Sequence, residues 1–169
     1  MEDILLLGKL QSGGLNVRIE EVNLLQLVEN IKSDVDLGQQ DGRTLGIEMK
    51  GDLVPVMLDM RLVHQSILNL VTNAFKYSKG EANPRIILDF TLGECVALHV
   101  EDFGLGIPKD EQERIFKDFY RSEKVQDIQG TGLGLSICTE FLKLNNCKLS
   151  LKSEVNRGST FTVKIPKQR

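Results

Sequence analysis

The stretch from residue 65 to residue 77 (QSILNLVTNAFKY) constrains the fold more than any other part of the chain. An α-helix turns by about 100° per residue, so a helix through this stretch separates a polar stripe from an apolar face. The apolar face consists of Val63, Ile67, Leu70, Val71, Ala74 and Phe75, and the polar stripe consists of Gln65, Asn69, Asn73, Lys76 and Tyr77. Solvated stripes are normally rich in Glu, Lys and Arg, and asparagine is a poor helix former. The two asparagines are therefore either incidental amides or side chains that coordinate a hard cation or order water.

Length and composition are those of one globular domain. A chain of 169 residues, 41% hydrophobic and 27% charged, can bury an independent core. The net charge is −3 with Lys and Arg spread along the chain, which argues against a nucleic-acid partner. The odd number of widely spaced cysteines predicts reduced thiols. The longest apolar run near the N-terminus, residues 4–7, is too short for a membrane span or a signal peptide. We expect a cytoplasmic domain, and membrane anchoring of a longer parent protein stays open.

Five elements are predicted before the central helix. They are a helix over 1–10, an edge strand over 16–22, a helix over 24–35, a strand over 45–49 and an extended piece over 54–58. Gly13 and Gly14 stop the first helix, and its apolar residues have no evident partner, so we interpret it as part of a longer helix. Asp59 is expected to cap the central helix, which ends near residues 77–80.

From Pro84 onward, hydrophobic residues alternate with polar ones. This period predicts a hairpin over 86–100 with one buried face, and its continuation places Asp102 on that face. The remaining expected elements are a helix over 109–119 with Ile115, Phe116 and Phe119 on its inner side, a polar segment over 120–129, a helix over 133–144 closed by Asn145 and Asn146, and strands over 148–153 and 159–165 joined by a turn at 156–158. The order of elements predicts an α/β fold, a two-layer sandwich with helices on one face of a mixed β-sheet.

Asp102 is the first residue that points to chemistry. A buried carboxylate is costly unless a group donates a hydrogen bond to it. Gly104 and Gly106 follow directly and leave space for a ligand close to the backbone. An adenine amino group would suit this position, although an aspartate at a strand end is also a common turn-former.

The run from Gly130 to Gly134 is the second such feature. Glycines at alternate positions before a helix expose backbone N–H groups at the positive end of the helix dipole, which suits an anion. A flexible hinge is the alternative. The two histidines are expected to be structural: His64 on the apolar side of the central helix near Val71 and Phe75, and His99 pointing out of its strand face. They form no metal site with the scattered cysteines.

Together, these segments resemble the catalytic and ATP-binding domain of bacterial two-component sensor histidine kinases, the HATPase domain of the GHKL superfamily that also contains gyrase, the heat-shock 90 chaperone and MutL. The resemblance covers residues 10–166 in four ordered motifs. Residues 68–78 resemble the N box, residues 102–107 the first glycine box, residues 115–121 the F box and residues 130–135 the second glycine box. Residues 158–161 are similar to the last glycine box. This resemblance implies a Bergerat-type fold that binds ATP and Mg²⁺.

The resemblance also implies a role for each site residue. Asp102 would accept from the adenine amino group, beside Gly104, Gly106 and Ile107. Asn73 would ligate Mg²⁺, and the implied catalytic residues are Asn69, Asn73 and Lys76. Lys76 and Tyr77 would meet the nucleotide, residues 120–129 would form the ATP lid, and Arg121 would reach the phosphates. The second glycine box would bind the phosphates through Gly130, Thr131, Gly132, Leu133, Gly134 and Leu135.

The resulting hypothesis is a Mg-ATP-binding domain that positions ATP for γ-phosphoryl transfer to a histidine. In this family that histidine lies on a separate dimerisation domain, through which the kinase also meets its response regulator, and we expect that domain to lie outside this sequence. Residues 1–13 would be the tail of the dimerisation helix and its linker, and residues 14–169 the catalytic domain, monomeric by itself and unable to autophosphorylate. The alternatives are a GHKL-type serine kinase or slow ATPase, and a nucleotide-binding module without transfer activity.

Overall fold

The computed structural model describes residues 2–167. The predictions that include Met1 (the start of the first helix) and residues 168–169 (the end of the catalytic domain) therefore lie partly outside the described residues. Its elements in chain order are α1 (Glu2–Gln11), β1 (Glu20–Val22), α2 (Leu24–Gly38), β2 (Gly46–Lys50), β3 (Val56–Leu58), α3 (Met60–Tyr77), β4 (Arg85–Asp89), β5 (Cys95–Asp102), the 3₁₀ turns η1 (Arg114–Phe116) and η2 (Glu123–Val125), α4 (Gly134–Leu144), β6 (Lys148–Glu154) and β7 (Gly158–Pro166).

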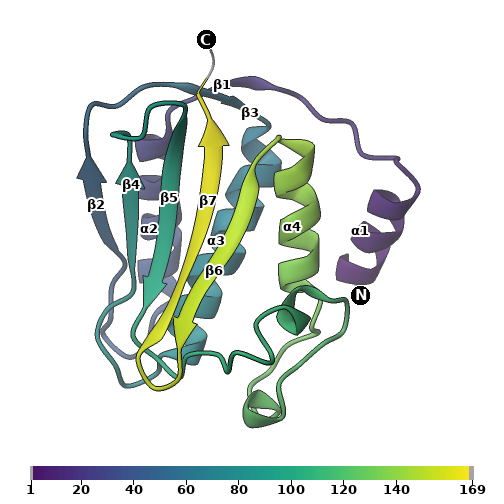
Figure 1. Cartoon of the computed structure of the whole chain (residues 1–169), viewed down its shortest axis with the longest axis vertical. Helices are drawn as coiled ribbons and strands as arrows, with labels where there is room; N and C mark the ends of the chain where they lie inside the picture. Colours follow the sequence, from purple (N-terminus) through teal and green to yellow (C-terminus); the bar gives the residue numbers. More distant parts are fainter. Residues whose placement is uncertain (1, 168–169) are drawn as a thin grey trace.

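Five strands form one layer of the fold, in the order β2-β4-β5-β7-β6, and β1 pairs with β3 in a separate two-stranded sheet. The β2–β4 pair is parallel and the other pairs of the large sheet are antiparallel, so the sheet is mixed. Figure 1 shows α2, α3 and α4 on one face of this sheet. The predicted α/β sandwich is therefore confirmed.

The helix α3 connects the core to the polar stripe. Asp59 caps its N-terminus, because the Asp59 carboxylate accepts from the backbone N–H groups of Arg61 and Leu62. The apolar face predicted from the sequence is buried throughout; its members are Val63, Ile67, Leu70, Val71, Ala74 and Phe75. They share one core with the inward residues of the hairpin, Ile86, Leu88, Val96, Leu98 and Val100. Burial of this face fixes the direction of the opposite, polar stripe.

The helix α1 has a partner, contrary to the expectation that its apolar residues would lack one. Figure 1 shows α1 beside α4. Leu6, Leu7 and Leu10 pack against a cluster of Leu62, Leu133, Ile137 and Phe141. The sheet leaves this side of α4 uncovered, and so a second helix can bury its apolar residues there. Gly13 ends α1 in the left-handed conformation with φ 67°.

The predicted helix over 109–119 is wrong. Only the 3₁₀ turn η1 forms, and Phe119, predicted to point inward, is 60% exposed with φ 61°. The backbone N–H of Phe119 donates to the carbonyl oxygen of Gly132 at 3.0 Å, and this long-range bond replaces the helical one. The predicted edge strand over 16–22 is also shorter, since only the three residues of β1 pair with β3.

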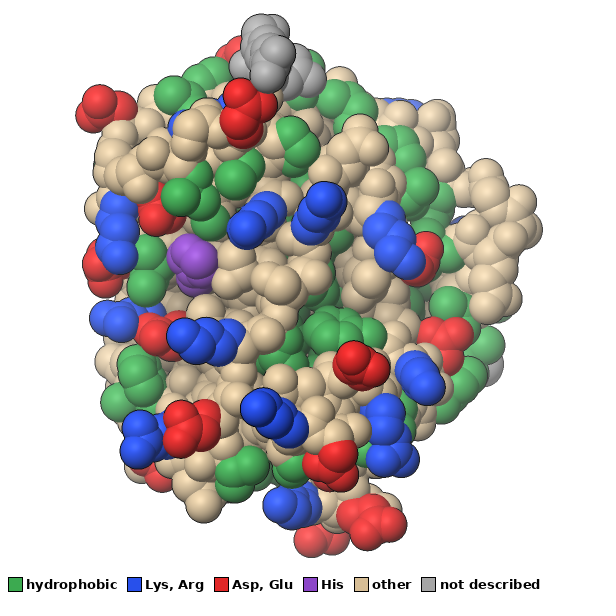
Figure 2. Space-filling view, in the orientation of Figure 1, with side chains coloured by type: hydrophobic (Ala, Val, Ile, Leu, Met, Phe, Trp, Pro, Cys, Tyr) green, Lys and Arg blue, Asp and Glu red, His purple; other side chains and the backbone are tan. Residues whose placement is uncertain are grey.

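The sheet face opposite the helices is exposed, and Figure 2 shows Lys, Arg, Asp and Glu side chains interspersed on it. His99 lies on this face as predicted, with its Nδ1 2.8 Å from the hydroxyl oxygen of Thr162, and burial lowers the pKa of its imidazole. His64 is half-buried rather than buried, although Val71 and Phe75 on the same helix side are buried. Within residues 2–167, none of the helices has both the length and the apolar composition needed to span a membrane.

Candidate nucleotide-binding site

A cavity of about 670 Å³ lies between α3, the loop after β5 and the segment that leads into α4. Every site residue predicted from the sequence lines it except Gly104 and Leu133. These residues are Asn69, Asn73, Lys76, Tyr77, Asp102, Gly106, Ile107, Arg121, Gly130, Thr131, Gly132, Gly134 and Leu135. The fold thus gathers four separated sequence motifs around one cavity, in the size range of small-molecule sites.

The helix α3 supplies one wall. The side-chain nitrogen Nδ2 of Asn69 is buried and has no hydrogen-bond partner among the residues that the structure describes. Gly134 lies so close that a Cβ built on it would be 2.6 Å from the Asn69 amide oxygen. Burial lowers the pKa of the Lys76 ammonium, and the positive charge of Arg121 lowers it further. An unpaired donor and a desolvated cation on the same wall favour an anionic ligand.

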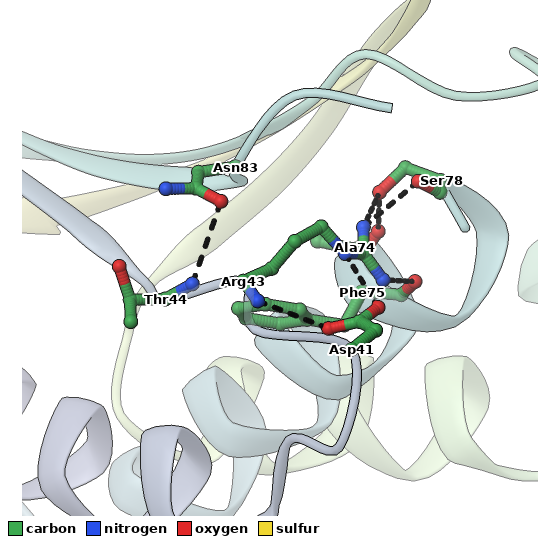
Figure 3. Close-up of polar contacts among 7 residues, drawn as sticks. All are labelled: Asp41, Arg43, Thr44, Ala74, Phe75, Ser78 and Asn83. Atoms are coloured by element: carbon green, nitrogen blue, oxygen red, sulfur yellow. Dashed lines mark hydrogen bonds and ion pairs between the residues drawn. The ribbon is translucent and has the colours of Figure 1, made fainter. Parts of the chain in front are cut away.

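Arg43 holds the C-terminal end of this wall in place (Figure 3). Its guanidinium group donates to the carbonyl oxygen of Phe75 at 2.9 Å, to the carbonyl oxygen of Ser78 at 2.8 Å and to the Ser78 hydroxyl at 3.0 Å. It also lies over the Phe75 ring, 5.1 Å from the centroid, and pairs with Asp41 at 2.7 Å. The hydrogen bonds from Arg43 lower the pKa of the Asp41 carboxyl. Arg43 thereby satisfies terminal helix carbonyls next to the cavity-lining pair 76–77.

Asp102 forms the floor of the cavity and is only 7% exposed. Its Oδ1 accepts from the backbone N–H of Gly104 at 2.9 Å. Burial raises the pKa of the Asp102 carboxyl, although hydrogen bonds from the Gly104 and Ser159 backbone oppose the shift. Gly104 faces α3 instead of the cavity, because a Cβ there would lie 2.2 Å from the carbonyl oxygen of Tyr77. Its role in the structure is close packing between the loop and the helix end.

The second glycine run leads into α4. Gly132 has φ 75°, and the Thr131 hydroxyl accepts from the N–H of Leu133 at 3.3 Å and donates to the Asp3 carboxylate at 3.0 Å. Leu133 is fully buried in the cluster that packs against α1, so its side chain anchors the run from behind. The N–H groups that begin α4 are left beside the cavity, which is the arrangement expected of an anion site.

The segment over 120–129 covers one side of the cavity. The Arg121 guanidinium donates to the carbonyl oxygens of Val125 at 3.0 Å, of Gln126 at 3.2 Å and of Ile128. Arg121 therefore holds the polar segment in a closed loop in this structure, and its expected contact with phosphate stays a prediction.

Glu111 is a cavity residue that sequence reasoning missed. Its side-chain oxygen Oε2 is buried without a hydrogen-bond partner among the described residues. The sequence held a signal for it. In the helix predicted over 109–119, Glu111 would share the inner face with Ile115, four residues later. A carboxyl group on an apolar face is the same kind of signal that pointed to Asp102.

The comparisons with known proteins agree with this geometry. Residues 58–169 match the family described as histidine kinase-, DNA gyrase B- and HSP90-like ATPases. The adaptive-response sensory kinase SasA of Gloeothece citriformis is 31% identical over 139 residues, which cover 82% of this chain and 35% of SasA. The sensor histidine kinase MtrB of Mycobacterium leprae is 31% identical over 169 residues, which cover 98% of this chain and 30% of MtrB.

Among solved structures, the nucleotide-free catalytic domain of the histidine kinase ThkA matches with a TM-score of 0.77 at 25% identity, covering 90% of this chain and 99% of the ThkA domain. The chain spans 35% and 30% of the lengths of SasA and MtrB, so it corresponds to one part of those proteins. Because the family match covers residues 58–169, more than half of the chain, the chain belongs to the histidine kinase-, DNA gyrase B- and HSP90-like ATPases, the superfamily that its motifs predict.

Proposed function

We propose that this chain is the catalytic domain of a sensor histidine kinase, which binds Mg-ATP and positions it for γ-phosphoryl transfer to a histidine on a separate dimerisation domain. The observation that carries the proposal is the pairing, in one cavity, of the buried Asp102 carboxylate with the cationic and N–H-rich wall formed by α3 and the start of α4. Asp102 accepts from the adenine amino group, and the opposite wall receives the phosphates.

The residues present fit the metal as well. Within the described residues, no group of three or more His, Cys, Asp or Glu side chains could hold a metal ion by itself. Mg²⁺ keeps several waters and needs only one or two protein oxygens when phosphates supply the rest, so the amide oxygen of Asn73 is sufficient. The unpaired Nδ2 of Asn69 is a donor and suits a phosphate oxygen. Bound Mg²⁺ would supply positive charge that neutralises the phosphate oxygens during transfer.

The work of this chain is mainly positioning and charge stabilisation. Lys76 supplies a positive charge, Gly130–Gly134 supplies backbone donors, and the loop closed by Arg121 excludes water from one side. Residues 1–13 are proposed as the end of the dimerisation helix and its linker, and the rest as the catalytic domain. The packing of Leu6, Leu7 and Leu10 on α4 supports this, because it couples α1 to the glycine run.

Titration calorimetry with ATP, with and without Mg²⁺, tests the binding step. We expect binding that Mg²⁺ strengthens, and Asp102→Asn should weaken it about ten- to hundredfold, since a charge-assisted hydrogen bond is lost. Asn73→Ala should weaken Mg-ATP binding while sparing metal-free binding. Binding that is indifferent to the metal in the wild type would contradict a kinase and favour a nucleotide-binding module.

Incubation with γ-labelled ATP tests the transfer step. The chain alone should stay unlabelled, and addition of the dimerisation domain of its parent protein should give an acid-labile, base-stable label on that domain. An acid-stable label would instead indicate a serine kinase. Phosphate release without labelled protein would indicate an ATPase, and a label on His64 or His99 would overturn their assignment as structural.

A further inference from the structure

The side chain of Glu111 has an unused hydrogen-bond acceptor in the cavity. Its Oε2 is one of two buried side-chain polar atoms without a partner among the described residues, and Glu111 lines the cavity. An acceptor that is removed from water and left unpaired destabilises a folded protein, so native structures seldom keep one without a reason. A ligand that donates a hydrogen bond at this position would supply the missing partner.

The backbone of Glu111 is held firmly. Its N–H donates to the carbonyl oxygen of Pro108 at 2.9 Å, and its carbonyl oxygen accepts from the N–H groups of Arg114 and Ile115 at 2.9 and 3.1 Å. The next residue, Gln112, donates from its side-chain amide to backbone carbonyls of the loop after β5 and of β6 at 2.9 and 3.1 Å. The Glu111 carboxyl is thus presented to the cavity from a fixed turn, and a ligand would find it already in place.

Glu111 lies between the two ends of the cavity. On one side, the backbone N–H of Glu111 donates a hydrogen bond to the carbonyl oxygen of Pro108, in the loop that continues from Asp102. On the other side is Tyr120: burial raises the pKa of the Tyr120 hydroxyl, and the charge of Glu111 and a hydrogen bond to its side chain raise it further, so the carboxylate already has Tyr120 as a neighbour while its Oε2 stays unpaired among the described residues. The carbonyl oxygen of Tyr120 lies 3.0 Å from where a Cβ on Gly132 would be, and so Tyr120 adjoins the glycine run. Glu111 therefore stands between the base end and the phosphate end.

A nucleotide offers hydrogen-bond donors at few places. The phosphates only accept, and a carboxylate would repel them. The amino group of the base is taken by Asp102. The ribose hydroxyls remain, and they lie between base and phosphates, as Glu111 does. We propose that Glu111 accepts a hydrogen bond from a ribose hydroxyl and makes this site select ribonucleotides over deoxyribonucleotides. This inference rests on the proposed nucleotide function.

Competition binding with ATP, 2′-deoxy-ATP and 3′-deoxy-ATP at constant Mg²⁺ tests the inference. The wild type should bind ATP about tenfold more tightly than at least one of the deoxy analogues, as expected for a lost hydrogen bond to a charged acceptor. In Glu111→Ala, ATP affinity should fall about tenfold while the affinity of that analogue stays the same, so that the discrimination disappears. Glu111→Gln keeps an acceptor oxygen without the charge, so it should lose only part of the discrimination between ATP and that analogue.

Glu113→Ala is the matched control, because Glu113 lies in the same segment, is exposed, and makes no side-chain capping bond to η1. It should retain the full preference for ATP. Equal weakening of ATP and both analogues by Glu111→Ala would overturn the inference and make Glu111 a support of the cavity wall. A changed Mg²⁺ requirement without loss of ribose discrimination would make it a metal ligand instead. A wild type that binds ATP without preferring it over either analogue refutes the inference alone, whereas a wild type that binds no ATP refutes the proposed function.

Discussion

Arg43→Met should destabilise the protein strongly, although Arg43 lies outside the cavity. Its side chain is only 11% exposed, and it donates to two backbone carbonyl oxygens and one hydroxyl at the end of α3. Methionine is an unbranched apolar side chain that fills part of the space, and it removes the charge, every donor and the guanidinium contact with the ring of Phe75. The substitution therefore removes the polar contacts of Arg43 while leaving an apolar side chain in place.

The magnitude follows from these contacts. Hydrogen bonds to a charged group contribute about 1.5–3 kcal/mol each, and the three bonds are not additive because they share one guanidinium. The carbonyl oxygen of Phe75 would lose the donor that Arg43 supplies, and the carbonyl oxygen of Ser78 would keep only the backbone N–H of Glu81 at 3.0 Å. We expect a loss of about 3 kcal/mol in the free energy of unfolding, which for a chain of this size lowers Tm by about 6–12 °C.

Urea and thermal unfolding measured by circular dichroism check this prediction. Asp41→Asn is the matched control: it removes the charge that pairs with Arg43 while keeping an amide oxygen as acceptor, and it should cost less stability than Arg43→Met. ATP affinity of the folded variant should also fall, because residues 76–77 are carried by the same helix end. A variant with Tm within about 2 °C of the wild type would refute the reasoning, since three lost hydrogen bonds cannot have so small an effect at a buried helix end.

Three further predictions concern the floor of the site, its packing and the cysteines. Asp102→Asn should match or exceed the wild-type Tm at pH 7 while weakening ATP binding. Burial raises the pKa of the Asp102 carboxyl in the folded protein above its ordinary 3.8, so this group stabilises the fold fully below pH 3.8 and loses that contribution as the pH rises through its folded-state pKa. Tm of the wild type measured from below pH 3.8 up to pH 7 would show this loss. Gly104→Ala should unfold at a lower temperature than the wild type, because the new Cβ would lie 2.2 Å from a carbonyl oxygen of the α3 end. Iodoacetamide at pH 8 should label Cys95 in the native protein and spare Cys138 and Cys147, because burial raises both of their thiol pKa values to about 12; mass spectrometry after digestion would reveal any labelling that contradicts this.

The sequence predicted the core elements well because each carries its own periodic signal. The buried face of α3 and the burial of Asp102 follow from periods of 3.6 and two residues, and the cap at Asp59 follows from the preference for aspartate before a helix. The gathering of the predicted site residues around one cavity followed from the motifs in combination, since the aspartate alone could be a turn-former and the glycine run alone a hinge.

The segment between Ile107 and Gly132 could not be predicted in the same way. Its apolar residues have helical spacing, yet the chain there is held by distant partners: the N–H of Phe119 bonds to Gly132, and Gln112 bonds to β6. Such long-range hydrogen bonds leave no trace in a local pattern. The partner of α1 was missed for a related reason, because the apolar side of α4 appears uncovered only when the sheet and helices are assembled.

Within residues 2–167, the buried polar side-chain groups that weaken this fold by lacking a hydrogen-bond partner lie together in the cavity. The two buried side-chain atoms without partners among the described residues, Asn69 Nδ2 and Glu111 Oε2, line the same cavity as the buried Asp102 carboxyl. Asn69 Nδ2 is a donor beside the glycine run, and Glu111 Oε2 and the Asp102 carboxyl are acceptors nearer the loop after β5. A nucleotide has the complementary order, with donors on its base and ribose and acceptors on its phosphates. A ligand that pairs with these polar groups recovers the free energy lost by leaving them unpaired. Under the proposed function, the polarity of the cavity therefore favours one orientation of the nucleotide, with its base toward Asp102 and its phosphates toward Asn69.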